Sequence, residues 1–166
     1  MAEISSLTIT LETAQVNKLV DIARRWYALI SLVEPVAVMV DPKWESALTS
    51  AEAELRDATG VLLDIVRPAV PQIQPETLGA TEFIRDANMP FGQEQAVQLA
   101  EIARAARLRS HQLRPMLSEV PGDSVTCWAA RKIVDRLRVH AGELLAIVRL
   151  VDPARATLVI KESEQN

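Results

Sequence analysis

Cysteine, glycine and aromatic residues are scarce in this sequence of 166 residues. The single cysteine, Cys127, has no partner for a disulfide, a zinc site or a redox motif, so we expect it to be a small buried side chain in a reducing, cytoplasmic setting. Only five glycines punctuate the chain, and the aromatic residues are three Trp, two Phe and one Tyr. This composition disfavours an all-β architecture and favours helices.

Long hydrophobic runs are also absent. The longest, residues 36–40 and 144–148, fall far short of the roughly 18 apolar residues that a membrane-spanning helix needs. No basic segment followed by an apolar one opens the chain, so we expect neither a leader nor a membrane partner. A length of 166 residues with 49% apolar content is enough for one domain, residues 1–166, with a core of its own.

Signatures of catalysis and of cofactor binding are missing. No glycine belongs to a dinucleotide fingerprint or to a phosphate loop. A di-iron bundle needs Glu three residues before His, but leucines occupy those positions before His111 and His140. His140 and Glu143 are predicted to be solvated neighbours on a helix flank rather than metal ligands. We therefore expect no metal, no cofactor and no enzymatic activity.

What the sequence does hold is helical periodicity. Apolar residues recur at steps of three and four in four stretches, which predicts an all-α four-helix bundle. The first helix is predicted to begin at a Thr10 cap and to end at Pro35, with residues 36–40 as a buried connector or brief strand. The third is predicted over residues 93–113 and the fourth over 124–151.

The second helix has the most regular pattern. Asp41 followed by Pro42 predicts its start, and it runs to about Val66. Gly60 inside it predicts a close approach of another helix. Its seam consists of Trp44, Leu48, Ala51, Leu55, Ala58, Leu62 and Ile65. Aromatic side chains on or near the apolar stripes are predicted to fill the core: Trp26, Tyr27, Trp44 and Trp128.

The segments between and beyond these helices are less regular. Residues 67–92 contain four prolines and predict a long crossover with one short helix at 80–87, where a partner would dock. Residues 4–11 and 156–161 mix β-branched and apolar residues, which predicts a short strand at each end of the chain. The two strands would form a ribbon joining the termini.

The net charge of −4 hides an uneven distribution. Residues 1–92 hold 7 Lys/Arg against 13 Asp/Glu, whereas residues 93–151 hold 9 against 6. Such asymmetry indicates a partner on the basic side or self-association between unlike halves. The alternative is that the charges simply cover solvated helix faces.

A line of cations on the third predicted helix is the one constellation that suggests chemistry. Its members follow one another at three- and four-residue steps and stay within about 80° of one another: Arg104, Arg107, His111 and Arg114. Guanidinium groups spaced in this way suit a phosphate backbone, without reading its sequence. Basic residues on the next helix would widen the surface: Arg131, Lys132, Arg136 and Arg138.

A cysteine-poor helical bundle of this size, with one acidic and one basic part, resembles the small helical subunit of CRISPR effector complexes. The resemblance covers the whole chain and lies in its architecture and charge. It implies a non-enzymatic role in which the basic line contacts single-stranded DNA or RNA while other faces contact neighbouring subunits, including copies of the same chain. This chain departs from that pattern in being acidic overall.

Two further interpretations stay open at this stage. A regulatory or inhibitory bundle would bind another protein through the crossover and an exposed apolar seam, with no role for nucleic acid. A helix-turn-helix regulator would need a short second helix that is free to enter a groove, and the long predicted helices fit that poorly.

Overall fold

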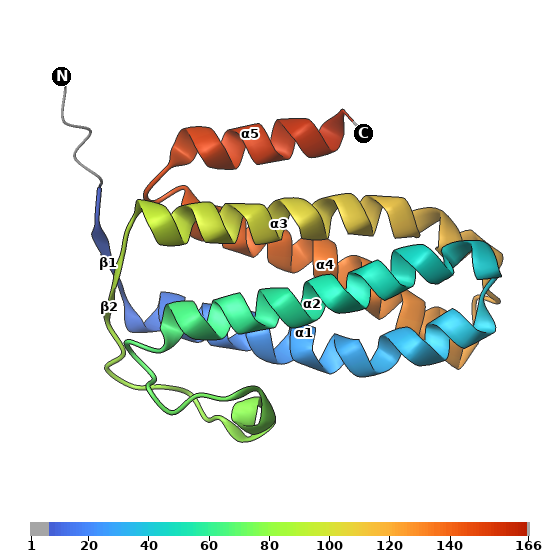
Figure 1. Ribbon diagram of the computed structural model, residues 1–166, viewed down its shortest axis with the longest axis horizontal. Helices are drawn as coiled ribbons and strands as arrows, with labels where there is room; N and C mark the ends of the chain where they lie inside the picture. Colours follow the sequence, from blue (N-terminus) through green and yellow to red (C-terminus); the bar gives the residue numbers. More distant parts are fainter. Residues whose placement is uncertain (1–6, 166) are drawn as a thin grey trace.

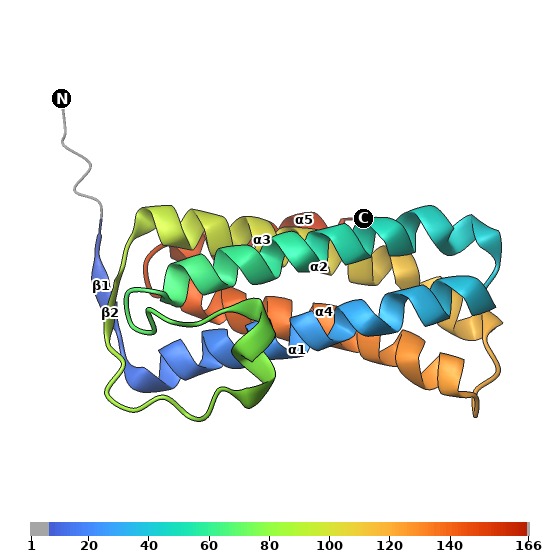
Figure 2. The ribbon, with the colours of Figure 1, turned by 60° about the horizontal axis from the view of Figure 1, so that its bottom comes forward.

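The computed structural model describes residues 7–165, and over this range the chain is an all-α bundle. Four long helices lie side by side, and a fifth, shorter helix packs outside them against α3 (Figure 1 and Figure 2). The helices are α1 Thr13–Met39, α2 Glu45–Val66, α3 Gln93–Leu113, α4 Val125–Val148 and α5 Pro153–Glu164. The predicted all-α four-helix bundle with a proline-rich crossover is confirmed, and α5 is an addition to it.

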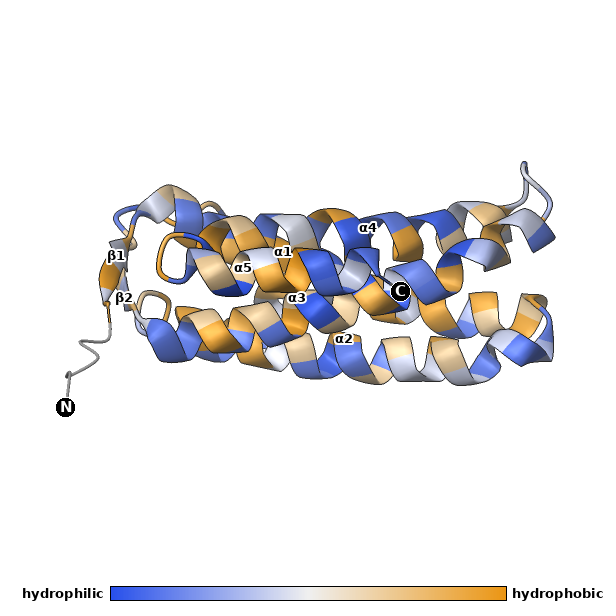
Figure 3. Cartoon of the chain, turned by 90° about the horizontal axis from the view of Figure 1, so that it is seen from above, coloured by the Kyte–Doolittle hydropathy of each residue, from blue (hydrophilic) through white to orange (hydrophobic). Residues whose placement is uncertain are grey.

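One continuous core runs along the bundle. Three leucines of the predicted α2 seam, spaced seven residues apart, are at most 1% exposed: Leu48, Leu55 and Leu62. Their burial agrees with the prediction. Cys127 is 1% exposed and buried, also as predicted. Each long helix alternates hydrophilic and hydrophobic residues along its length, as expected of a helix with one face in a core (Figure 3).

The aromatic residues divide between core and surface. Trp26 is 1% exposed, and Trp44 is half-buried against the core. The prediction of core filling is wrong for Tyr27 and for Trp128, which is 55% exposed. Trp128 lies in the first turn of α4, at one end of the bundle, and the Lys132 amine covers its ring at 5.4 Å from the centroid.

Helix α1 differs from its prediction at both ends. Thr10 lies in a strand, and Glu12 takes the cap position instead, its N–H donating to Gln15 Oε1 at 2.9 Å. Pro35 does not end the helix, which continues to Met39. Pro35 is solvent-exposed, so the carbonyl that it leaves without an N–H partner can be hydrated, while Val36 in the next position is fully buried.

Helix α2 begins where the sequence predicts. Asp41 accepts a hydrogen bond from the Lys43 N–H at 2.9 Å, and a short 3-10 helix, η1 Pro42–Trp44, leads into α2. The predicted role of Gly60 is wrong, because no described atom of a neighbouring helix lies within 4 Å of where its Cβ would be.

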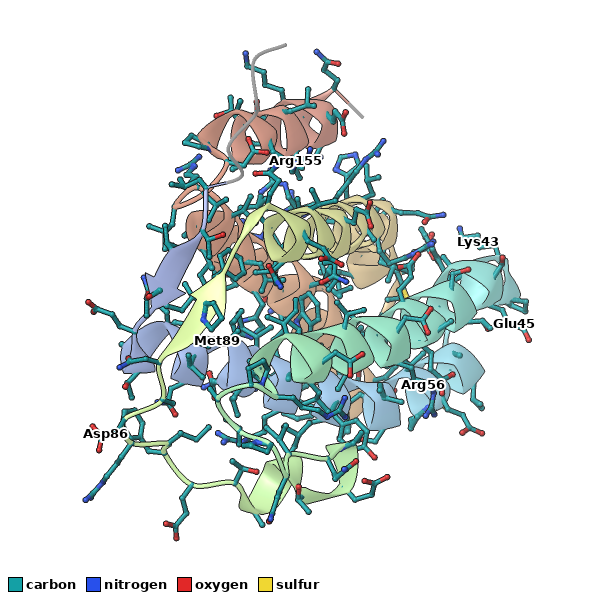
Figure 4. All side chains as sticks on the ribbon, turned by 60° about the vertical axis from the view of Figure 1, so that its left-hand side comes forward. Lys43, Glu45, Arg56, Asp86, Met89 and Arg155 are labelled. Carbon is teal, nitrogen blue, oxygen red and sulfur yellow. The ribbon has the colours of Figure 1, made fainter. Side chains whose placement is uncertain are left out.

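The crossover holds its own short elements. A 3-10 helix, η2 Pro75–Ala80, forms just before the stretch 80–87 where a helix was predicted, so that prediction is wrong. Arg24 of α1 holds this segment by donating to the carbonyls of Leu78 at 3.0 Å and Thr81 at 2.8 Å. At its outer turn, Asp86 has a positive φ of 54° (Figure 4).

A two-stranded antiparallel sheet closes one end of the bundle, but its partners are not the predicted ones. β1 Ile9–Leu11 pairs with β2 Met89–Phe91 at the end of the crossover, with Ile9 opposite Phe91 and Leu11 opposite Met89. The buried side chains of Leu11, Met89 and Phe91 tie this sheet to the core. Residues 4–6 of the predicted first strand lie outside the described range.

The predicted strand at 156–161 is wrong, because these residues belong to α5. Asp152 caps this helix by accepting from the Arg155 N–H at 3.1 Å, and Pro153 occupies its first position. Ala156 and Val159 are buried, and α5 lies along α3 (Figure 4, where Arg155 marks α5).

Candidate functional site

The predicted cationic line lies on the face of α3 that meets α5, and α5 covers part of it. Arg104 Nε lies 3.0 Å from Glu162 Oε2, so the first cation of the line is paired within the chain. Arg107 Nε donates to Ser163 Oγ at 2.6 Å, and the Ser163 hydroxyl lies 2.6 Å from the Val159 carbonyl that it donates to. Within residues 7–165, the ion pair with Glu162 therefore neutralises the first member of the line and leaves the other members without a carboxylate partner.

The rest of the line opens into a hollow of about 130 Å³ between α3, α4 and the end of α5, which we call the basic hollow. Its lining consists of Arg107, Ser110, His111, Arg114, Arg138 and Ser163. None of these lining residues carries a carboxylate. His111, Arg114 and Arg138 are exposed, and none of them forms an ion pair within residues 7–165.

A buried hydrogen bond joins α3 and α4 beside the hollow. Ser110 is 2% exposed and donates its hydroxyl hydrogen to the Val134 carbonyl at 2.8 Å. This contact places Arg138, one turn beyond Val134, beside the α3 line. The Ser110 hydroxyl is committed to the helix pair and is not an available nucleophile.

The other predicted basic residues do not line the hollow. Arg131 is exposed on α4 about two turns before Arg138. Lys132 covers the Trp128 ring, and the half-buried Arg136 lies near His140 on the flank toward α1, where its carbonyl accepts from Trp26 Nε1 at 3.4 Å. Of the eight predicted residues, the structure brings together four: Arg107, His111, Arg114 and Arg138.

His140 is not the solvated residue that was predicted. It is 5% exposed, and its Nδ1 makes no hydrogen bond with any described residue, although Glu143 lies 3.7 Å away. Burial lowers the pKa of His140, and the nearby Glu143 carboxylate opposes that shift. Glu143 is itself paired with Lys18 at 3.2 Å.

In the described part of the chain, no group of three His, Cys, Asp or Glu side chains converges. Over the same residues, no helix has the length and apolar content to cross a membrane. The basic hollow suits a different ligand. Three guanidinium groups and an imidazole around a small polar space can hold a phosphate, sulfate or carboxylate group by charge-assisted hydrogen bonds.

Several contacts at and near the candidate site were not predicted from the sequence. Ser110 and Ser163 have no local signature, and Ser163 joins the hollow only because α5 folds back on α3. Arg109 forms a two-point ion pair with Glu54 of α2, at 3.1 Å from Nε and 2.7 Å from Nη2. Its position on α3, facing α2, could have been inferred from the helical phase of the line.

Comparison with protein-family models, with curated proteins and with solved structures finds no match to this chain.

Proposed function

We propose that this chain is a non-enzymatic subunit of a nucleoprotein assembly, and that the basic hollow holds a backbone phosphate of a single-stranded nucleic acid. The observation that carries the proposal is the convergence of Arg107, Arg114, Arg138 and His111 on one small hollow without a carboxylate in its described lining. The role is the one that the resemblance to the CRISPR small helical subunit implies, and other faces of the bundle would contact neighbouring protein subunits.

The size of the hollow limits the strength of this contact. A space of about 130 Å³ suits one phosphate, with a second on the exposed rim, rather than the four that an uncovered cationic line would neutralise. Each phosphate on a single strand contributes about −0.7 to the slope of log K against log salt. The proposal therefore implies a slope of about −1.4, weak binding and no preference among bases.

The test is fluorescence anisotropy with a labelled oligothymidylate. Arg114→Glu with Arg138→Glu reverses two exposed cations of the hollow, and we expect at least about a tenfold loss of affinity, since charged hydrogen bonds contribute about 1.5 to 3 kcal/mol each. The matched control is Arg85→Glu with Arg149→Glu, which makes the same charge change at exposed positions elsewhere. Equal losses in both variants would refute a localised site.

A second candidate function is a regulatory or inhibitory bundle that binds another protein without nucleic acid. Exposed apolar side chains at one end of the bundle favour it: Val38 at 76%, Met39 at 69%, Val125 at 83% and Trp128 at 55% exposure. The end of α1 and the start of α4 meet at this end (Figure 1 and Figure 2). Nuclease treatment separates the two functions, because a protein partner bound directly would stay with the chain after digestion.

A further inference from the structure

A second hollow lies on a different side of α3, between α2 and α3, and has the opposite character. Its volume is about 210 Å³, and its walls are aliphatic side chains of the two helices. It reaches down to Trp26 of α1 and Leu137 of α4, which are 1% and 3% exposed. α2 packs less extensively on α3 than on α1, so the groove between them stays open at the surface. We call it the acidic-rimmed pocket.

Carboxylates surround the mouth of this pocket. Asp57 of α2 and Glu101 of α3 both line it and are exposed, and neither forms an ion pair with any residue from 7 to 165. Glu54 also lines the pocket, but Arg109 already neutralises it. Two unpaired negative charges, one from each wall, therefore face the opening of an apolar space.

The floor of the pocket is formed by Trp26, which contacts α4 on its other side. The Trp26 indole donates to the Arg136 carbonyl at 3.4 Å, and its ring meets that of His140 edge to face, with centroids 6.4 Å apart. An engineered apolar cavity of about 150 Å³ stays dry and binds benzene. A space of about 210 Å³ with an aromatic floor therefore has room for one ring and a short attached chain, but not for a peptide helix.

We infer that the acidic-rimmed pocket binds a small organic cation with an aromatic body. The ring would lie against Trp26 and Leu137, and the positive group would stay at the mouth between Asp57 and Glu101. An anion would be repelled by these two carboxylates, and a neutral ring would leave their mutual repulsion unrelieved. This inference does not rest on the nucleic-acid role, because it involves none of the residues of the basic hollow.

The charge preference should be modest and sensitive to salt, because the two carboxylates are exposed and screened. We expect 2-phenylethylammonium to bind with a Kd on the order of 1 mM or tighter. 2-Phenylethanol, which keeps the ring and replaces the ammonium with a hydroxyl, should bind about three- to tenfold more weakly, and phenylacetate more weakly still.

The experiment is a nuclear magnetic resonance titration of the intact chain with these three compounds. Asp57→Asn with Glu101→Gln should remove the preference for the cation while leaving 2-phenylethanol binding unchanged. The control, Glu76→Gln with Glu82→Gln, removes two exposed carboxylates of the crossover and should keep the preference. Ala105→Phe should fill the pocket and abolish binding of all three compounds, with a thermal unfolding curve to show that the variant folds.

Each outcome decides something. Equal affinity for the cation and the alcohol in the unmodified chain would overturn the charge assignment, as would a preference that survives in Asp57→Asn with Glu101→Gln. Absence of saturable binding by the cation, or binding that persists in a folded Ala105→Phe variant, would overturn the pocket itself. Oligothymidylate binding by the same variants is expected to stay unchanged, so failure here is separate from failure of the proposed function.

Discussion

The two hollows on either side of α3 differ in what surrounds them. The basic hollow has a polar lining and sits where α5 and α4 flank the cationic line, whereas the acidic-rimmed pocket has a floor of core side chains and carboxylates only at its mouth. Arg109 is a cation of α3 on the side of the acidic-rimmed pocket, but it forms an ion pair with Glu54. An uneven charge distribution in the sequence therefore indicates a candidate site only where the folded chain brings charges of one sign together without ion-pair partners.

The largest expected effect comes from enlarging the acidic-rimmed pocket from inside. Leu55 is 1% exposed and lines this pocket, so Leu55→Ala should cost about 2 to 5 kcal/mol of unfolding free energy. Leu158→Ala, at a leucine that is 55% exposed on α5, should cost less than about 0.5 kcal/mol. Chemical denaturation measures both, and equal midpoints for the Leu55 variant and the unmodified chain would show that this packing is misjudged.

The second prediction separates Arg104, which lies outside the basic hollow, from Arg107, which lines it. Arg104→Glu with Arg107→Glu should leave the helical circular dichroism intact and weaken oligothymidylate binding and assembly onto a nucleoprotein partner by about tenfold or more. Arg104→Glu alone should weaken oligothymidylate binding less than about threefold, because Arg104 pairs with Glu162 and lies outside the basic hollow. A single variant as defective as the double would mean that the hollow does not mark the site.

A third prediction concerns the wall of α2. Gly60 lies inside the helix, and no described atom of a neighbouring helix comes within 4 Å of where its Cβ would be. Gly60→Ala should therefore raise the unfolding free energy by about 0.5 to 1 kcal/mol through helix propensity alone. Destabilisation in a thermal melt would reveal a contact that the static bundle lacks.

The smallest effect is a difference between two pH profiles, and it concerns the floor of the acidic-rimmed pocket. Burial holds the pKa of His140 below its ordinary value of 6.5, so the folded chain binds this proton less readily than the unfolded chain. The neutral form of His140 therefore contributes fully to the unfolding free energy above pH 6.5. This contribution is lost as the pH falls from 6.5 through the lowered pKa of the folded chain. His140→Gln should flatten the fall in thermal midpoint below pH 6.5, and a profile identical to that of the unmodified chain would contradict this assignment.

Local signals predicted the long helices well. The bounds of α3 match the prediction, and those of α2 differ only by the turn of 3-10 helix at its start, because caps and apolar periodicity act within a few residues. Asp152 and Pro153 form the same start signal as Asp41 and Pro42, and they begin α5. The β-branched residues of the predicted strand 156–161 mislead when a short segment is judged by residue type alone: Thr157, Val159 and Ile160.

The candidate site was predictable only in part, because it depends on contacts between distant segments. Helical spacing placed Arg107, His111 and Arg114 on one line, and this follows from geometry alone. The covering of Arg104 by Glu162, 58 residues away along the chain, depends on α5 folding back over α3. Tertiary packing decides which cations remain unpaired, and the spacing of residues along one helix does not predict this.

The salt dependence of oligothymidylate binding tests the central claim most directly. For the unmodified chain the slope of log K against log salt should be about −1.4, and for Arg114→Glu with Arg138→Glu it should approach zero. A slope that is the same in both proteins would show that the bound phosphates are not held in the basic hollow.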